Sequence, residues 1–282
     1  MPDWFSDDVK ANGLRIHYYR TGGDKPPLVL SHGATDSGLC WTRVARDLES
    51  DYDVILPDAR GHGQSDAPAS GYTSADGAAD LAGFIDALGL QRPAVGGHSM
   101  GAATTLRFIA DYPDVPRCAL LEDPPFWLGE RPTPAPGREN PRDALRRTVL
   151  EAKENGLKAT IVRGRAASPT WADEEFEPWA QAKVQVSRAF LDDLSRGAMT
   201  PEWLDQLPRV SCPVLLVTGD PELGGIVSQE VAEKARQLLH ALQVVHIGGA
   251  GHNIRREQFG PFVAEVRAFL AAHVPTRAGA RR

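Results

Sequence analysis

The sequence has 282 residues, of which 42% are hydrophobic and 24% charged, a length that suits one large α/β domain with an insertion or two small domains. Its formal net charge of −6 argues against a nucleic-acid partner, and no apolar run reaches the roughly 18 residues that a membrane span needs. The N-terminus has no basic stretch followed by an apolar one and the three cysteines lie far apart, so we expect a cytoplasmic protein with reduced thiols.

The first part of the chain alternates between apolar runs and helical spacing. Asn12-Gly13 lies between two alternating runs within residues 9–18, which predicts a β-hairpin. Continuous apolar runs indicate strands that are buried on both faces, and strands that alternate with helices favour a parallel, doubly wound sheet. The predicted elements are strands over 27–31 and 53–57 and helices over 39–48 and 73–88.

A G-x-S-x-G motif at 97–101 stands between a predicted strand over 93–95 and a predicted helix over 102–110. A serine hydroxyl becomes a useful nucleophile when a sharp turn presents it beside a base. Glycines two residues on either side let the strand and the helix pass closely. The turn also directs the amide of Met100, at the helix N-terminus, toward an oxyanion that forms at Ser99.

The pattern changes after a further buried strand over 117–121. From Pro124 to about Pro208 the strand signals stop and short amphipathic helices replace them. We therefore expect a core of residues 1–123 and 209–282 with a helical cap inserted at 124–208. Four of the six tryptophans lie in this insertion, where they serve either its own small core or the wall of a pocket beneath it. They are Trp127, Trp171, Trp179 and Trp203.

The last part of the chain returns to alternating strands and helices and then offers a base for the serine. Buried strands are predicted over 212–218 and 242–247, with helices over 228–241 and 258–272. His252 follows three glycines in four residues, on the loop after the last strand, and such a loop can reach the strand ends where Ser99 projects.

Four motifs in this order resemble the α/β-hydrolase superfamily over nearly the whole chain. They are Ser31-His32-Gly33, the D-x-R-G-x-G-x-S segment at 58–65, the turn at 97–101 and Gly249-Ala250-Gly251-His252. The resemblance implies an eight-stranded, mostly parallel α/β sheet with an inserted helical cap. It also implies a structural rather than catalytic role for the turn at 60–63.

By the same resemblance, Ser99 is the nucleophile, His252 the general base and then acid, and the amides of Ala34 and Met100 form the oxyanion hole. The carboxylate that orients His252 is less clear from the pattern. The family usually places it after the strand at 214–217, where Asp220 ranks first and Glu222 second. Some members place it after the preceding strand, which here offers Glu122 or Asp123.

A serine at position 99 argues against relatives that open epoxides or displace halide through an aspartate. We expect hydrolysis of a carboxylic ester or lactone of a small, largely apolar substrate through an acyl-enzyme. Alternatives are an aminopeptidase or amidase, a carbon–carbon bond hydrolase, a cofactor-free perhydrolase and a non-enzymatic ligand receptor. An aminopeptidase needs acidic cap residues to bind the substrate ammonium, and the cap carries an acidic run at 173–177. That run also fits the solvated start of a helix.

No metal-ligand spacing and no phosphate-binding glycine loop is visible in the sequence, so we expect neither a metal nor another cofactor. The expected partner is a small-molecule substrate, with no nucleic acid and no membrane. A monomer and a homodimer are both compatible with the sequence.

Overall fold

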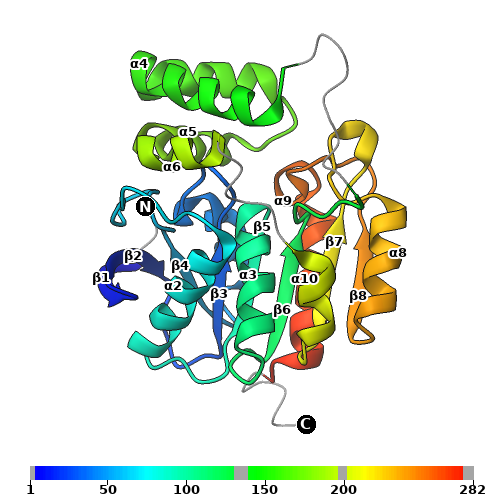
Figure 1. Cartoon of the computed structure of the whole chain (residues 1–282). Coiled ribbons are helices and arrows are strands. Elements are labelled where there is room, and N and C mark those ends of the chain that lie inside the picture. Colours follow the sequence, from blue (N-terminus) through cyan, green and yellow to red (C-terminus); the bar gives the residue numbers. More distant parts are fainter. Residues whose placement is uncertain (1–3, 130–138, 196–201, 276–282) are drawn as a thin grey trace.

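The computed structural model describes residues 4–129, 139–195 and 202–275 (Figure 1). Its strands are β1 Phe5–Ala11, β2 Leu14–Arg20, β3 Pro27–Ser31, β4 Asp53–Pro57, β5 Ala94–His98, β6 Cys118–Glu122, β7 Val214–Thr218 and β8 Leu242–His246. Its α-helices are α1 Thr42–Leu48, α2 Ser74–Ala87, α3 Met100–Asp111, α4 Pro141–Ala167, α5 Phe176–Gln185, α6 Arg188–Ser195, α7 Trp203–Gln206, α8 Gln229–Leu238, α9 Ile254–Glu257 and α10 Phe259–His273. The 3-10 turns are η1 Gly38–Trp41, η2 Asp173–Glu175, η3 Leu207–Arg209 and η4 Pro221–Leu223.

The strands form one eight-stranded sheet in the order β1-β2-β4-β3-β5-β6-β7-β8. β1, β2 and β4 pair antiparallel, and all later pairs are parallel. The hairpin turns at Asn12 and Gly13, whose φ angles of 48° and 79° match the left-handed pair that a two-residue hairpin requires. The prediction of a mostly parallel, doubly wound sheet is confirmed.

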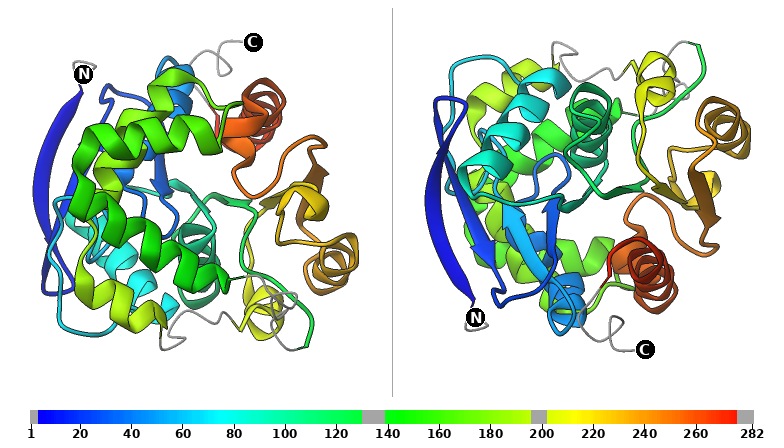
Figure 2. Two further views of the ribbon diagram at one scale, coloured as in Figure 1. Left: turned by 90° about the horizontal axis from the view of Figure 1, so that it is seen from above. Right: turned by 90° about the horizontal axis from the view of Figure 1, so that it is seen from below.

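Helices cover both faces of the sheet (Figure 2). Alternate side chains of the central strands enter two separate cores, one on each face. Val29 and Val95 pack with apolar residues of α2, α3 and α8. Leu28 and Leu30 pack on the opposite face with α1 and α10. Because both faces of the sheet are covered, the sequences of these strands are continuous apolar runs and do not alternate between apolar and polar residues.

The helices α4, α5 and α6 form an insert that covers the end of the sheet where β5 meets α3 (Figure 1). They lie between the end of β6 at Glu122 and the start of β7 at Val214. α4 consists of two helical pieces that join at Gly156, whose φ of 77° interrupts the helix. Part of the predicted 124–208 cap, namely 130–138 and 196–201, lies outside the described residues. No helix in the described ranges is long and apolar enough to span a membrane.

Candidate active site

Ser99 occupies the tip of the turn between β5 and α3, with φ 52° and ψ −113°. A non-glycine residue rarely adopts a positive φ, and such strain is typical of functional sites. The two glycines of the motif are required by close backbone contacts. A Cβ on Gly97 would lie 2.3 Å from the carbonyl of Gly101, and one on Gly101 would lie 2.2 Å from the carbonyl oxygen of Ser31. The close passage of strand and helix is therefore as expected.

His252 faces Asp123 across a short hydrogen bond. The Nδ1–H of His252 donates to the Oδ2 of Asp123 at 2.6 Å, and the Asp123 side chain is fully buried. The backbone amides of Ile226 and Val227 also donate to this carboxylate, at 2.9 and 3.0 Å. With Nδ1 engaged, the Nε2 of His252 is left to accept a proton from a nucleophile.

The expectation that Asp220 orients His252 is wrong. The Asp220 carboxylate accepts instead from the Nε2 of His246 at 2.9 Å and from the amide of Gly249 at 2.7 Å. Asp220 follows β7, whose other neighbour is the edge strand β8, and its side chain pairs with that strand. Asp123 follows β6, which lies directly beside the Ser99-bearing strand β5.

The other two carboxylates considered from the sequence are not at His252 either. Glu222 is exposed on η4, and Glu122 is buried against Arg255 at 3.1 Å. What selects Asp123 is the contact of its side chain with His252, whereas the strand pattern of the sequence leaves both Asp123 and Asp220 open.

Ser99 and His252 line the same cavity, which has a volume of about 310 Å³. Ala34, on the loop after β3, and Met100, the first residue of α3, also line it. The first amides of a helix lack intrahelical acceptors, so the Met100 N–H is available to an oxyanion. The roles of Ala34 and Met100 as oxyanion donors stay a prediction. The remaining described lining residues are Pro125, Trp127, Pro141, Arg142, Leu145, Leu194, Gly224 and Ile226.

Three of the four tryptophans of the insertion take the roles expected for them, and Trp203 takes neither. Trp127 lines the cavity. Trp171 and Trp179 instead pack edge to face with ring centroids 6.2 Å apart, inside the cap. Trp203 stacks on Phe126 at 4.8 Å, in the core below.

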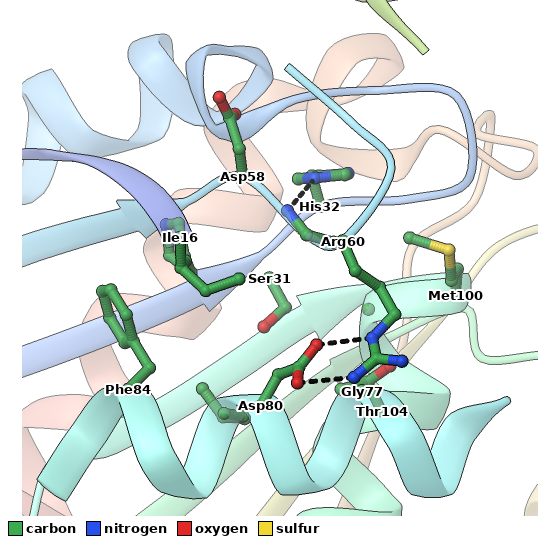
Figure 3. Close-up of a pocket in the computed structure, with 14 residues that line it drawn as sticks. Ile16, Ser31, His32, Asp58, Arg60, Gly77, Asp80, Phe84, Met100 and Thr104 are labelled. Atoms are coloured by element: carbon green, nitrogen blue, oxygen red, sulfur yellow. Dashed lines mark hydrogen bonds and ion pairs between the residues drawn. The ribbon is translucent and has the colours of Figure 1, made fainter. Parts of the chain in front are cut away.

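A smaller cavity of about 50 Å³ lies behind the turn, between β3 and α2 (Figure 3). Ser99 and His252 do not line it, and its volume is too small for a substrate. Beside it the Nε and Nη2 of Arg60 donate to the Asp80 carboxylate, each at 2.6 Å. Arg60 thus anchors its turn to α2, in agreement with a structural role.

Six charged side chains, none more than 6% exposed, form a network that sequence reasoning missed. This buried ion cluster comprises Asp36, Glu122, Glu175, Lys183, Arg255 and Arg256. Asp36 accepts from Lys183 at 3.2 Å, Arg255 at 3.3 Å and Arg256 at 3.2 Å. Arg256 also donates to Glu175 at 3.2 Å, so this member of the acidic run at 173–177 is not solvated. None of that run lines the Ser99 cavity.

Three buried histidines surround the backbone of the site. His62 accepts from the amide of Thr35 at 3.4 Å, and His32 accepts from the amide of Ala59 at 3.0 Å. His98 donates from Nε2 to the carbonyl of His252 at 2.9 Å. Burial lowers the pKa of His32 and holds the pKa values of His62 and His98 well below their usual range.

These shifts predict loss of stability in mild acid. Below about pH 6.5 the unfolded histidines bind protons that the folded protein excludes, so the free energy of unfolding decreases as pH falls. Each such group contributes at most about 1.4 kcal/mol per pH unit to this slope, and the three together at most about 4 kcal/mol per pH unit. Urea unfolding at several pH values measures this slope. A free energy of unfolding that stays constant or rises between pH 7.5 and 5.5 contradicts it.

Comparison with known proteins places this geometry in a family. Residues 26–255 match the alpha/beta hydrolase fold family. The chain is 31% identical over 272 residues to N-formylmaleamate deformylase of Pseudomonas putida, covering 93% of this chain and 95% of that protein. It is 30% identical over 245 residues to 2-(acetamidomethylene)succinate hydrolase of Mesorhizobium japonicum, covering 83% and 84%. The crystal structure of an N-formylmaleamic acid deformylase from Pseudomonas putida S16 superposes with a TM-score of 0.81 at 25% identity, covering 93% of this chain and 100% of that one. The chain belongs to the α/β-hydrolase fold family.

Proposed function

We propose that the chain is a serine hydrolase that removes a small acyl group from the nitrogen of a carboxylate-bearing substrate. The observation that carries the proposal is the strained Ser99 on one cavity wall with His252, which Asp123 orients through a 2.6 Å hydrogen bond. A hydroxyl, an imidazole and a buried carboxylate in this relation perform acyl transfer on several unrelated folds.

The proposed reaction proceeds in two halves. The Ser99 Oγ attacks the amide carbonyl carbon while His252 Nε2 takes the hydroxyl proton, and the resulting oxyanion accepts from the amides of Ala34 and Met100. The C–N bond then breaks as His252 returns the proton to the leaving nitrogen, which leaves an acyl-enzyme. Water attacks this ester with His252 as base, and the carboxylic acid leaves as Ser99 regains its proton.

Support for the carboxylate comes from Arg142. Among the described residues that line the cavity, Arg142 is the only one with a permanent charge. It has no acidic partner in the described part of the chain, so its guanidinium is available to a ligand. Arg142 also lies in the first turn of α4, whose N-terminus favours anions. The two curated relatives are named for N-acyl derivatives of carboxylates, a formylmaleamate and an acetamidomethylene succinate.

Hydrolysis of an ester or lactone is the second candidate function. The observation that favours it is the apolar character of most of the cavity wall, where Leu145, Leu194 and Ile226 lie with Trp127. The same serine, histidine and oxyanion donors serve an ester, whose leaving alcohol needs less help from the acid than an amine does. The two candidates therefore differ in leaving group and in the use of Arg142.

The proposal predicts a charge preference that depends on Arg142. We expect kcat/KM for N-formylmaleamate or 2-(acetamidomethylene)succinate to exceed that of the neutral carboxamide counterpart roughly 10- to 100-fold, the worth of a hydrogen bond to a charged group. Arg142→Met should remove most of this preference by raising KM for the carboxylate substrate. Steady-state assays with both substrate forms on wild type and variant measure the effect.

Arg147→Met is the matched control, because Arg147 lies on the same helix, pairs with Glu139 at 3.0 Å and does not line the cavity. It should retain the wild-type preference. Faster turnover of p-nitrophenyl acetate than of any N-acyl compound, with no effect of Arg142→Met, would favour the ester candidate instead.

A further inference from the structure

We propose that Lys183, on the cap helix α5, is a positioning residue that holds the oxyanion loop, residues 33–36, in its active shape. The cap would then complete the catalytic machinery as well as cover the substrate. The inference rests on the proposed hydrolase function, because it assigns Lys183 an effect on the step in which the oxyanion forms. Its physical basis is a buried contact between α5 and the loop that carries Ala34.

The contact joins Lys183 to the backbone immediately after Ala34. The Nζ of Lys183 donates to the carbonyl oxygen of Thr35 at 2.9 Å and to the Asp36 carboxylate at 3.2 Å. Lys183 is 6% exposed although it belongs to the cap. A lysine ammonium is costly to bury, so these acceptors account for its position.

The loop needs such support because Thr35 has a φ of 62°. A non-glycine residue in this region is held there by its surroundings at a cost of about 1 to 3 kcal/mol. Here the amide of Thr35 donates to His62 at 3.4 Å, and its carbonyl accepts from Lys183. One contact comes from the core and the other from the cap, and together they fix the peptide groups on both sides of Thr35.

The buried ion cluster connects this loop to the rest of the site. Asp36 accepts from Arg255, and Arg255 donates its backbone amide to Glu122 at 2.9 Å. Glu122 directly precedes Asp123, whose carboxylate faces His252. The backbone carbonyl of Glu122 accepts from the amide of Ser99 at 3.0 Å. The cluster contains three cations and three carboxylates, so removal of Lys183 leaves Asp36 paired with two arginines.

The expected consequence is a loss of kcat with little change in KM. The oxyanion exists in the transition state and not in the bound substrate. A displaced Ala34 amide therefore reduces the stabilisation of the transition state and leaves substrate binding unchanged. Complete loss of an oxyanion donor costs about 100- to 1,000-fold in kcat, and a displaced donor costs less. We therefore expect Lys183→Met to lower kcat roughly 10- to 100-fold and to change KM less than about threefold. Lys183→Arg, which keeps the charge and the donors, should recover at least a third of the wild-type kcat.

Lys153→Met is the matched control. Lys153 is another cap lysine whose Nζ donates to a carbonyl of α5, that of Val184, but it does not contact the oxyanion loop. Its replacement also removes a lysine-to-carbonyl hydrogen bond of the cap, but one in which α5 is the acceptor and not the donor. We expect it to lower the melting temperature of the protein and to leave kcat within twofold of the wild type.

A second readout does not depend on knowing the substrate. An alkyl fluorophosphonate forms a bond between its phosphorus and Ser99 Oγ and releases fluoride and the serine proton, and the phosphoryl oxygen occupies the oxyanion hole. We expect Lys183→Met to slow this labelling in proportion to kcat. Should Lys183→Met not fold, Lys183→Gln replaces it in both measurements.

A folded Lys183→Met or Lys183→Gln protein with wild-type kcat and labelling rate overturns the inference. So does a Lys183→Met variant whose loss Lys183→Arg does not reverse and Lys153→Met reproduces, because both results would indicate a general role in cap stability. Rapid labelling of wild-type Ser99 without turnover of any amide or ester would instead contradict the proposed function. The labelling rates of the Lys183 variants would still test the inference in that case.

Discussion

Replacing Ser99 with alanine is expected to abolish turnover while the fold stays intact. Loss of a catalytic serine typically lowers kcat by about 10⁶-fold, because no other group supplies the nucleophile. The hydroxyl lies on a cavity wall and fills no core space. We therefore expect a change of less than about 1 kcal/mol in the free energy of unfolding. Steady-state rates and urea unfolding of the same preparation measure both quantities.

Ser228→Ala provides the opposite result as a control. Ser228 caps α8, where its hydroxyl accepts from the amide of Val231 at 3.3 Å, away from the Ser99 cavity. Removal of such a cap costs about 1 kcal/mol of stability. We expect this variant to be less stable and fully active. Residual turnover above 1% of wild type in a highly purified Ser99→Ala protein would show that another group is the nucleophile.

Asp123→Asn is expected to lower kcat by about 10⁴-fold, the second largest effect. The asparagine Oδ1 keeps the bonds that the amides of Ile226 and Val227 make to Oδ1 of Asp123, at 3.1 and 3.0 Å, so its NH₂ takes the Oδ2 position and faces His252. That NH₂ donates to Nδ1 of His252 and moves the ring proton to Nε2, where the base must accept. The variant should fold and bind substrate, so kcat changes more than KM.

Asp220→Asn distinguishes the two carboxylates that follow neighbouring strands. Its partners are His246 and the amide of Gly249, both outside the Ser99 cavity. We expect kcat within a few-fold of the wild type and a small loss of stability. An inactive Asp220→Asn protein beside an active Asp123→Asn protein would reverse the assignment that the geometry supports.

Most of the fold follows from the sequence because its signals are local. Two-residue turns such as Asn12-Gly13, buried runs such as 27–31 and the glycines of the 97–101 turn each dictate structure within a few residues. The motif order then places Ser99 and His252 at one end of the sheet. These features depend on backbone geometry, which the residue types largely determine.

The remainder depends on which segments become neighbours. Asp123 and Asp220 both follow a buried strand, and only the partner that each carboxylate meets in the folded chain, His252 or His246, separates their roles. Glu175 and Arg256 resemble surface residues in the sequence because a charged side chain is rarely buried without a partner. The two residues are each other's partners, and they lie 81 residues apart along the chain. No local pattern in the sequence predicts a pair of residues that lie so far apart.

The buried ion cluster has a consequence for exchanging caps between relatives. Glu175 and Lys183 come from the insertion, whereas Asp36, Arg255 and Arg256 come from the core. A transplanted cap that lacks a carboxylate and a cation at these two positions would take one buried ion pair each from Arg256 and Asp36, which destabilises the protein. Chimeric enzymes built to alter substrate choice should therefore carry both residues across the junction with the helices that bear them.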